Sequence, residues 1–411
     1  MEPFNPFRPE VIADPYPYYE RYRQEDPVHW SPVLDAWVLT RYEDVSFVLR
    51  DPRFSANRRL ARNRFVQITV ARQDYVSPLG NVVTMLGADP PEHTRLRRLV
   101  SQSFTLKAIN ALRPRIEELV HQLLDGAEAK ARREGYFDVI GDLAYPLPVT
   151  VIAEMLGIPS EDMDTFKRWS DDIALSLEPF APPEALERVR QSMQEMVEYF
   201  QEALAQRRRQ PRHDIVSVLV EAEREGRVRS EAEAIATLIL LLVAGNETTT
   251  NFLGNAVLAL LRHPDQLQRL REDPTLTERA VEELLRYDPP AQTTTRVALQ
   301  EVEIGGRRIE PYQVVFAVLG AANRDPQVFP EPDRLDLARH PNPHLAFGEG
   351  IHFCLGASLA RAESQIALRA LLERFPHLRL VEEEPCWRPN YILRGLKRLL
   401  VSPSTTGRTW A

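Results

Sequence analysis

A single cysteine stands in a glycine-rich stretch that could present its sulfur to a metal ion. Cys354 lies between Gly350 and Gly356, and Ala357 begins a pattern typical of a long helix. Glycine permits backbone conformations and close approaches that a side chain forbids. The amides of such a loop, and the positive end of the following helix, favour a thiolate over a thiol. The stretch would therefore hold one soft anionic sulfur against something flat that lies on its backbone.

Taken alone, a lone cysteine is more often a small buried hydrophobic residue than a ligand. Here the spacing Phe-Gly-x-Gly-x-His-x-Cys-x-Gly-x-x-Leu-Ala-Arg, from Phe347 to Arg361, favours an iron ligand instead. On these residues the chain resembles the cytochrome P450 monooxygenases, in particular the soluble bacterial members of the family. The resemblance implies that Cys354 is the metal ligand, the axial thiolate of a haem iron. It also implies haem b, iron protoporphyrin IX, as the cofactor.

A long apolar helix is expected to cross the core. Ser230 and Glu233 form a capping-box pattern, and apolar residues continue to about Arg262, just before Pro264. About 32 residues at 1.5 Å each give a length of ~48 Å. A helix with so little polar surface has to be surrounded by protein.

The middle of that helix, from Ala244 to Thr250, contains a glycine, a carboxylate and threonines. These are poor choices for a core helix, because glycine costs ~1 kcal/mol relative to alanine and an unpaired buried carboxylate costs more. One interpretation is a local kink whose hydroxyls bond back to carbonyls one turn earlier. The other is a widened groove that admits oxygen and water. The resemblance implies the second, with Thr248 and Glu247 as catalytic alcohol and proton-gating acid, and Ala244 and Gly245 leaving room above the haem.

Basic side chains elsewhere suit the carboxylates of a haem. His93 and Arg97 are four residues apart on a predicted helix that begins at about Pro90, so they share a face. Such a pair usually marks a solvated surface. The resemblance implies instead that both bind haem propionates through charge-assisted hydrogen bonds, together with Arg296 and His352. The cofactor-binding residues that it implies are His93, Arg97, Ala244, Gly245, Arg296, Phe347, Gly348, His352, Cys354 and Gly356.

Glu283 and Arg286 lie three residues apart, a spacing that by itself gives only a weak helix-surface pair. The resemblance implies a buried structural triad that holds the haem loop, with Arg334 as the third member. Breaking such a triad would leave an uncompensated buried charge, which costs ~3–5 kcal/mol.

Length, charge and cysteine count set outer limits on the fold and its partners. The chain has 411 residues and a net charge of −8, which argues against nucleic acid as a partner. With only Cys354 and Cys386 no structural disulfide is expected, which suits the cytoplasm. The longest apolar run, Leu238 to Gly245, is far short of the ~20 residues that span a membrane, and the N-terminus lacks a signal pattern.

The remaining pattern predicts a single domain over residues 1–411 that is mainly α with small β sheets. Amphipathic helices are expected at 108–133 and 183–208, and a lid-like break at 175–183. Short strands are expected at 28–30 and 36–40. Candidate substrate contacts are Val82, Val83, Leu86, Thr293, Thr294, Thr295, Ile392 and Leu393.

The resemblance implies a monooxygenase that acts on a small apolar substrate, by hydroxylation or epoxidation. Electrons would come from a ferredoxin or flavodoxin and its NAD(P)H-dependent reductase, because no flavin, nicotinamide or iron–sulfur motif is present. Arg95, Arg98 and Arg361 are expected to form a cationic docking face. Two alternatives stay open: a peroxide-driven peroxygenase, and a haem sensor or carrier without turnover. The acid–alcohol pair Glu247–Thr248 argues against both.

Overall fold

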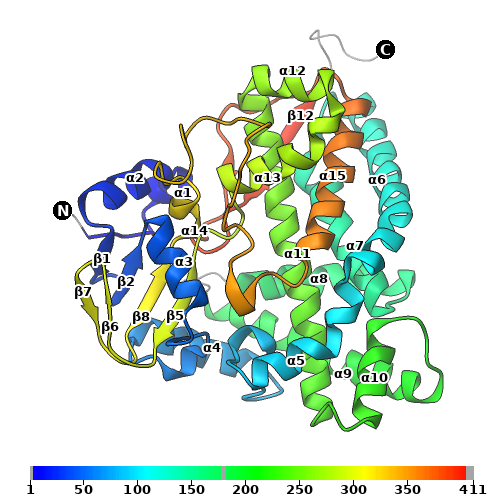
Figure 1. The fold of residues 1–411 in the computed structure, drawn as a ribbon. Helices are drawn as coiled ribbons and strands as arrows, with labels where there is room; N and C mark the ends of the chain where they lie inside the picture. Colours follow the sequence, from blue (N-terminus) through cyan, green and yellow to red (C-terminus); the bar gives the residue numbers. More distant parts are fainter. Residues whose placement is uncertain (1–2, 177–181, 404–411) are drawn as a thin grey trace.

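The computed structural model describes residues 3–176 and 182–403, so the predicted lid at 175–183 falls largely outside the described residues. Over the described ranges the fold is mainly α with small β sheets, which confirms the predicted class. Figure 1 shows most helices gathered around the long helix α11 (Glu231–Arg262) on one side, with a small sheet on the other.

Helix α11 begins where the capping pattern predicts and crosses the core. The Ser230 hydroxyl accepts a hydrogen bond from the Glu233 backbone N–H at 3.2 Å. The Glu233 carboxylate does not close the box on Ser230; it accepts from the Arg229 backbone N–H and from the Arg95 side chain. Among the described helices α11 alone is long and apolar enough to cross a membrane, and 67% of its apolar window is buried inside the protein. Its apolar surface is therefore used in the core.

Helix α15 (Ala357–Arg374) follows the cysteine loop directly and packs against α6 (Leu106–Glu134), α13 (Thr277–Tyr287) and α11. Its buried residues Leu359, Ala362 and Ile366 recur every three or four positions, the period that places side chains on one helical face. The packing fixes the direction in which the cysteine loop enters the core.

A five-stranded sheet forms the second part of the fold, in the order β1-β2-β8-β5-β3. The β2–β8 pair is parallel and the other pairs are antiparallel. In the β5–β8 register Arg296 lies opposite Val315. The strands are β1 (Val28–Ser31), β2 (Ala36–Leu39), β3 (Phe54–Ser55), β5 (Thr294–Ala298) and β8 (Val314–Ala317).

Further helices and short strands complete the described chain. The helices are α1 (Pro9–Ala13), α2 (Tyr16–Glu25), α3 (Tyr42–Arg50), α4 (Arg64–Val76), α5 (Glu92–Val100), α7 (Pro146–Leu156), α8 (Met163–Ser176), α9 (Pro183–Arg209), α10 (Ile215–Arg224), α12 (Pro264–Glu272) and α14 (Leu319–Ala322). The strands are β4 (Phe137–Asp138), β6 (Val302–Ile304), β7 (Arg307–Ile309), β9 (Arg379–Leu380), β10 (Cys386–Trp387), β11 (Leu396–Arg398) and β12 (Leu400–Ser402).

The buried triad is present, but Arg334 is not its third member. Glu283 and Arg286 form a fully buried ion pair at 2.7 Å, and Arg339 donates to both Glu283 oxygens at 3.1 Å. Arg334 instead pairs with Glu331 at the surface, where its side chain is 59% exposed. The Arg334 backbone carbonyl, not its guanidinium, faces the triad and accepts from Arg286 and Arg339. The prediction of Arg334 was therefore wrong by five positions.

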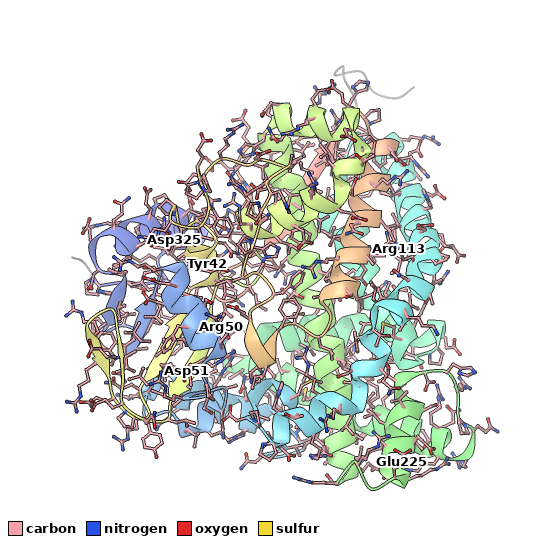
Figure 2. The ribbon with its side chains drawn as sticks, viewed as in Figure 1. Tyr42, Arg50, Asp51, Arg113, Glu225 and Asp325 are labelled. Carbon is pink, nitrogen blue, oxygen red and sulfur yellow. The ribbon has the colours of Figure 1, made fainter. Side chains whose placement is uncertain are left out.

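Helix α3 anchors the cysteine loop to the sheet side of the molecule. The Tyr42 backbone N–H donates to Asp325 at 2.8 Å, and Arg50 at the other end of α3 lies 3.5 Å from the Glu349 carboxylate. Figure 2 shows Tyr42 and Arg50 along α3, beside the segment that carries Asp325. The Ser46 hydroxyl also donates to Glu349, at 2.6 Å. The cysteine loop is thus held between α3 on one side and α15 on the other.

Candidate functional site

A cavity of about 360 Å³ lies between α11 and the cysteine loop. It brings together residues that are far apart in the sequence and that the family resemblance had grouped. Of the predicted site residues, eleven line it and Glu247 does not. Those that line it are His93, Arg97, Ala244, Gly245, Thr248, Arg296, Phe347, Gly348, His352, Cys354 and Gly356.

The cysteine loop presents its thiol to the cavity. The Cys354 backbone N–H donates to the Phe347 carbonyl at 2.9 Å, which closes the loop, and the side chain lines the cavity. Gly350 has φ +72°, and a Cβ there would lie 2.7 Å from the Leu49 carbonyl oxygen, so this position requires glycine. Burial raises the pKa of the Cys354 thiol, and a hydrogen bond from the Gly356 backbone opposes the rise. A metal ion bound to the sulfur would favour the thiolate.

Two imidazoles at the cavity have buried nitrogen atoms without a partner in the described structure. His93 and His352 lie with ring centroids 4.3 Å apart, and the Nε2 atom of each has no hydrogen bond within the described structure. Burial lowers the pKa of both rings, that of His352 to about 4, with Arg296 adding to the shift. Both rings are therefore neutral at neutral pH, and each can donate one N–H to an acceptor. Buried polar atoms normally have partners, so these two fit an acceptor that a cofactor would supply.

Two arginines complete a donor set of the kind that binds carboxylates. Arg97 donates to the Ile351 and Phe353 carbonyls at 3.3 and 2.7 Å, so it also fastens the cysteine loop. Arg296 donates to the Thr295 carbonyl at 2.9 Å, and burial lowers its pKa to about 10. A guanidinium buried this way favours an anion beside it. The residues present thus fit the propionates of a haem.

On α11 the alcohol and the acid of the predicted pair face different surroundings. The Thr248 hydroxyl faces the cavity and donates to the Ala244 carbonyl at 3.1 Å. This bond to the carbonyl one turn earlier is the one that the local-kink interpretation predicts. The Glu247 carboxylate instead accepts from Arg388 at 3.0 Å and from Asn251 at 3.2 Å. The two side chains can cooperate only across the turn of the helix or through water.

Several cavity residues were not predicted, and some predicted ones do not line it. Leu86 and Thr293 to Thr295 line the cavity, whereas Val82, Val83, Ile392 and Leu393 do not. Val83 is 45% exposed, because the segment turns its Met85 and Leu86 side chains, not Val83, toward the cavity. The missed lining residues that carry polar groups are Arg58, Thr249, Glu349, Glu363 and Ser364. Thr249 and Glu349 stand inside the α11 and cysteine-loop motifs, so their place at the cavity could have been predicted. Arg58, Glu363 and Ser364 stand outside these motifs, and the sheet side and α15 bring them to the cavity.

Two of the three arginines expected in a docking face are already paired. Arg95 forms ion pairs with Glu92 and Glu233, and Arg361 pairs with Glu282 at 2.7 Å. Their charge is largely neutralised by these partners. Arg98 is exposed and remains the candidate with an open charge within the described residues.

The buried carboxyl group of Glu363 on α15 should make the stability of the protein depend on pH. Its side chain is 1% exposed, and burial raises its pKa from the ordinary 4.5 to about 8. The folded state therefore binds this proton more tightly than the unfolded state, and stability falls as pH rises between these two values. As pH rises from 5 to 7, the free energy of unfolding of the parent protein should fall relative to that of Glu363→Gln by about 1.4 kcal/mol per pH unit.

Urea denaturation of the haem-loaded protein at several pH values measures this difference. Glu373→Gln is the matched control, since Glu373 is exposed on the same helix and pairs with Arg369. Parallel pH profiles for Glu363→Gln and the parent protein would contradict a protonated buried Glu363.

Most of the chain, residues 34–399, matches the family model for cytochrome P450. The chain belongs to the cytochrome P450 family. This P450 therefore uses a haem iron, and the resemblance that rested on the cysteine loop is confirmed. P450 chemistry also requires a substrate, O₂ and redox partners that deliver electrons.

Relatives in the same family are similar to this chain along nearly its full length. Cytochrome P450 107B1 of Saccharopolyspora erythraea is 42% identical over 406 residues, 97% of this chain and 97% of that protein. Cytochrome P450 monooxygenase PikC of Streptomyces venezuelae is 42% identical over 397 residues, 95% of this chain and 91% of that protein. A crystal structure of P450BioI in complex with hexadec-9Z-enoic acid ligated acyl carrier protein has a TM-score of 0.87 at 39% identity, covering 96% of this chain and 98% of that one. This P450 is a monooxygenase, which inserts one atom of O₂ into an organic substrate.

Proposed function

We propose that this P450 holds haem b in the cavity between Cys354 and Thr248 and oxidises a small apolar molecule there, by hydroxylation or epoxidation. The observation that carries the proposal is the pairing of one free thiol on one wall with a helix that presents Ala244, Gly245 and Thr248 on the other. When bound, the haem would supply the activation of O₂, with Cys354 as its sulfur ligand. Phe347, Gly348 and Gly356 would lie along the face next to the sulfur.

The propionates would be held by the donors that this structure leaves available. His93 and His352 each offer an imidazole nitrogen without a partner, and Arg97 and Arg296 offer guanidinium groups on the same cavity wall. Charge-assisted hydrogen bonds to carboxylates are about twice as strong as neutral ones. This set would fix the orientation of the haem and neutralise its carboxylates.

Proton delivery would use Thr248 inside the cavity and Glu247 outside it. Arg388 holds the Glu247 carboxylate and is itself 26% exposed, so Glu247 is one side chain away from solvent. Thr248 can exchange its bond to the Ala244 carbonyl for a bond to oxygen or water in the cavity. In this arrangement Glu247 takes up protons at its carboxylate, and Thr248 positions the last proton donor.

The partners and location follow from the same proposal. Since P450 chemistry needs electrons from outside, we propose a ferredoxin or flavodoxin with its NAD(P)H-dependent reductase as the donors. We also propose a cytoplasmic location and a single domain over residues 1–411. The exposed Arg98 is the residue that we expect at the electron-donor contact.

Replacing Thr248 by alanine tests the proton-delivery role. Positioned proton transfer contributes ~10²–10⁴-fold, and water can replace only part of it. We therefore expect Thr248→Ala to release hydrogen peroxide and to form at least about tenfold less product per NADPH consumed. The measurement uses a surrogate ferredoxin with its reductase, and the compound that gives the largest optical shift in a library screen.

Thr249→Ala is the matched control, because Thr249 lines the same wall but hydrogen-bonds to Glu363. Coupling in Thr249→Ala should stay near that of the parent enzyme. Full coupling in Thr248→Ala would remove Thr248 from the mechanism. Turnover by the parent enzyme with peroxide alone, at the rate seen with ferredoxin, would favour the peroxygenase alternative.

A further inference from the structure

The cavity contains one more arginine than a haem requires. Arg58, Arg97 and Arg296 line it, and a haem brings two carboxylates. Arg97 and Arg296 already lie in the donor set with the two imidazoles and donate to backbone carbonyls. The Arg58 backbone carbonyl accepts from the Ala61 N–H, but its guanidinium has no hydrogen bond or ion pair to any residue in the described part of the chain. Its charge is therefore left without a partner inside a cavity.

The surroundings of Arg58 make an open positive charge costly. Burial lowers its pKa, and it also contributes to the lowered pKa of Arg296, so the two guanidiniums repel each other. Arginine nevertheless remains charged in proteins. A desolvated cation without a counter-charge is unfavourable. An anion placed beside it would stabilise the charge in place of the lost hydration.

Asp89, an acidic residue that acts on Arg296 and His352, is committed elsewhere. Asp89 accepts hydrogen bonds from the Ser55 hydroxyl and from the Ala56 backbone N–H. Its charge acts on the pKa values of Arg296 and His352, whereas it is not among the influences on Arg58. The negative charge of Asp89 thus acts on His352 and Arg296, and it does not compensate the positive charge of Arg58.

Two further hydroxyl groups near Arg58 also lack partners. The Thr295 hydroxyl, on the same cavity wall, and the Tyr391 hydroxyl are buried and make no hydrogen bond within the described structure. Tyr391 lies close enough to Arg58 for each to alter the pKa of the other. Phe7 holds the Tyr391 ring in an edge contact at 5.1 Å. A guanidinium and two hydroxyls, none of which has a hydrogen-bond partner within the described residues, therefore gather in one region.

We propose that Arg58 binds the carboxylate of the substrate, so that this P450 takes an apolar acid with its charged end at Arg58. A guanidinium can donate two parallel hydrogen bonds to a carboxylate, which fixes both position and direction. The apolar body would extend over Met85, Leu86 and Leu241 toward the wall with Thr248. The proposal rests on the proposed function, because the haem has to occupy the Cys354 side of the cavity.

The local backbone separates Arg58 from its neighbour and supplies a control. The Asn57 side chain accepts from the Arg59 backbone N–H and starts a short turn. Arg59 points away from the cavity and forms an ion pair with Asp74 of α4. Two adjacent arginines thus differ in one respect that matters, namely whether they face the cavity or solvent.

Optical titration of the haem-loaded enzyme with myristic acid and with methyl myristate tests the proposal. Near neutral pH the acid is ionised and the ester is not, while their apolar bodies match. The parent enzyme should bind the acid at least tenfold more tightly than the ester. Arg58→Leu should lose at least tenfold in affinity for the acid and keep its affinity for the ester. Arg59→Leu should match the parent enzyme with both compounds.

Other outcomes overturn the proposal. A parent enzyme that binds the ester as tightly as the acid, or binds neither, has no carboxylate anchor. Equal losses for acid and ester in Arg58→Leu, with lower haem content or a shifted reduction potential, would make Arg58 a propionate ligand instead. The carbon monoxide spectrum of every variant is recorded first, so a failure of sulfur ligation is recognised separately from a failure at Arg58.

Discussion

Replacing Cys354 by serine is expected to abolish the far-shifted carbon monoxide absorption of the reduced enzyme and to stop oxygen insertion. The shift reports sulfur ligation, and the thiolate is the ligand that pushes electron density toward the iron to favour O–O cleavage. Of the two cysteines in the chain, Cys354 is the one that lines the cavity, so it is the residue that can supply a thiolate there. Reduced, carbon monoxide-treated spectra and product formation with a surrogate ferredoxin measure both effects.

Cys386→Ser is the control for this experiment. Cys386 is also an exposed free thiol, but it lies on β10 opposite Arg398 and does not line the cavity. Its replacement should leave both the spectrum and turnover unchanged. A Cys354→Ser variant that keeps the shifted absorption would show that the sulfur of this loop is not the ligand.

Replacing Arg339 by alanine is expected to lower the free energy of unfolding by ~3–5 kcal/mol, because it leaves buried charge on Glu283 less compensated. Arg339 donates to both Glu283 oxygens and also to the carbonyls of Pro330 and Arg334, so its removal breaks further hydrogen bonds within the same segment. These bonds join α13 to the chain that leads into the cysteine loop. Loss of haem should therefore accompany unfolding at lower urea concentration.

Arg334→Ala is the matched control in the same segment. Its ion pair with Glu331 is exposed on both sides, and exposed pairs are worth ~0–1 kcal/mol. The urea midpoint of Arg334→Ala should stay close to that of the parent protein. If Arg334→Ala and Arg339→Ala were equally destabilised, the assignment of the third triad member made from this structure would be contradicted.

Features set by neighbouring residues could be predicted from the sequence. The cap of α11 at Ser230 and the end of that helix near Arg262 depend on local spacing, and both lie where predicted. The cysteine loop depends on glycine positions a few residues apart, and Gly350 is indeed required by its approach to Leu49. Such features depend only on residues within one or two helical turns of each other, so their spacing in the sequence is enough to predict them.

Features set by the path of a loop could not be predicted in this way. Arg334 and Arg339 lie in one irregular segment, and only the turn around Glu331 decides which side chain reaches Glu283. Arg388 is 141 residues from Glu247, so no spacing rule connects the two. Arg58 likewise enters the cavity only because β3 pairs with β5.

The parallel pairing of β2 with β8 has a consequence for how the chain is made. On the ribosome β2 is finished early, but its partner edge appears only when Val314 to Ala317 have emerged. Until then β2 exposes unpaired backbone groups, which invite association with other chains. The cysteine loop follows β8 in the chain, so its sulfur becomes available only after the partner edge of β2 has emerged. We therefore expect chaperones that cover the unpaired edge of β2 during synthesis to raise the yield of folded protein.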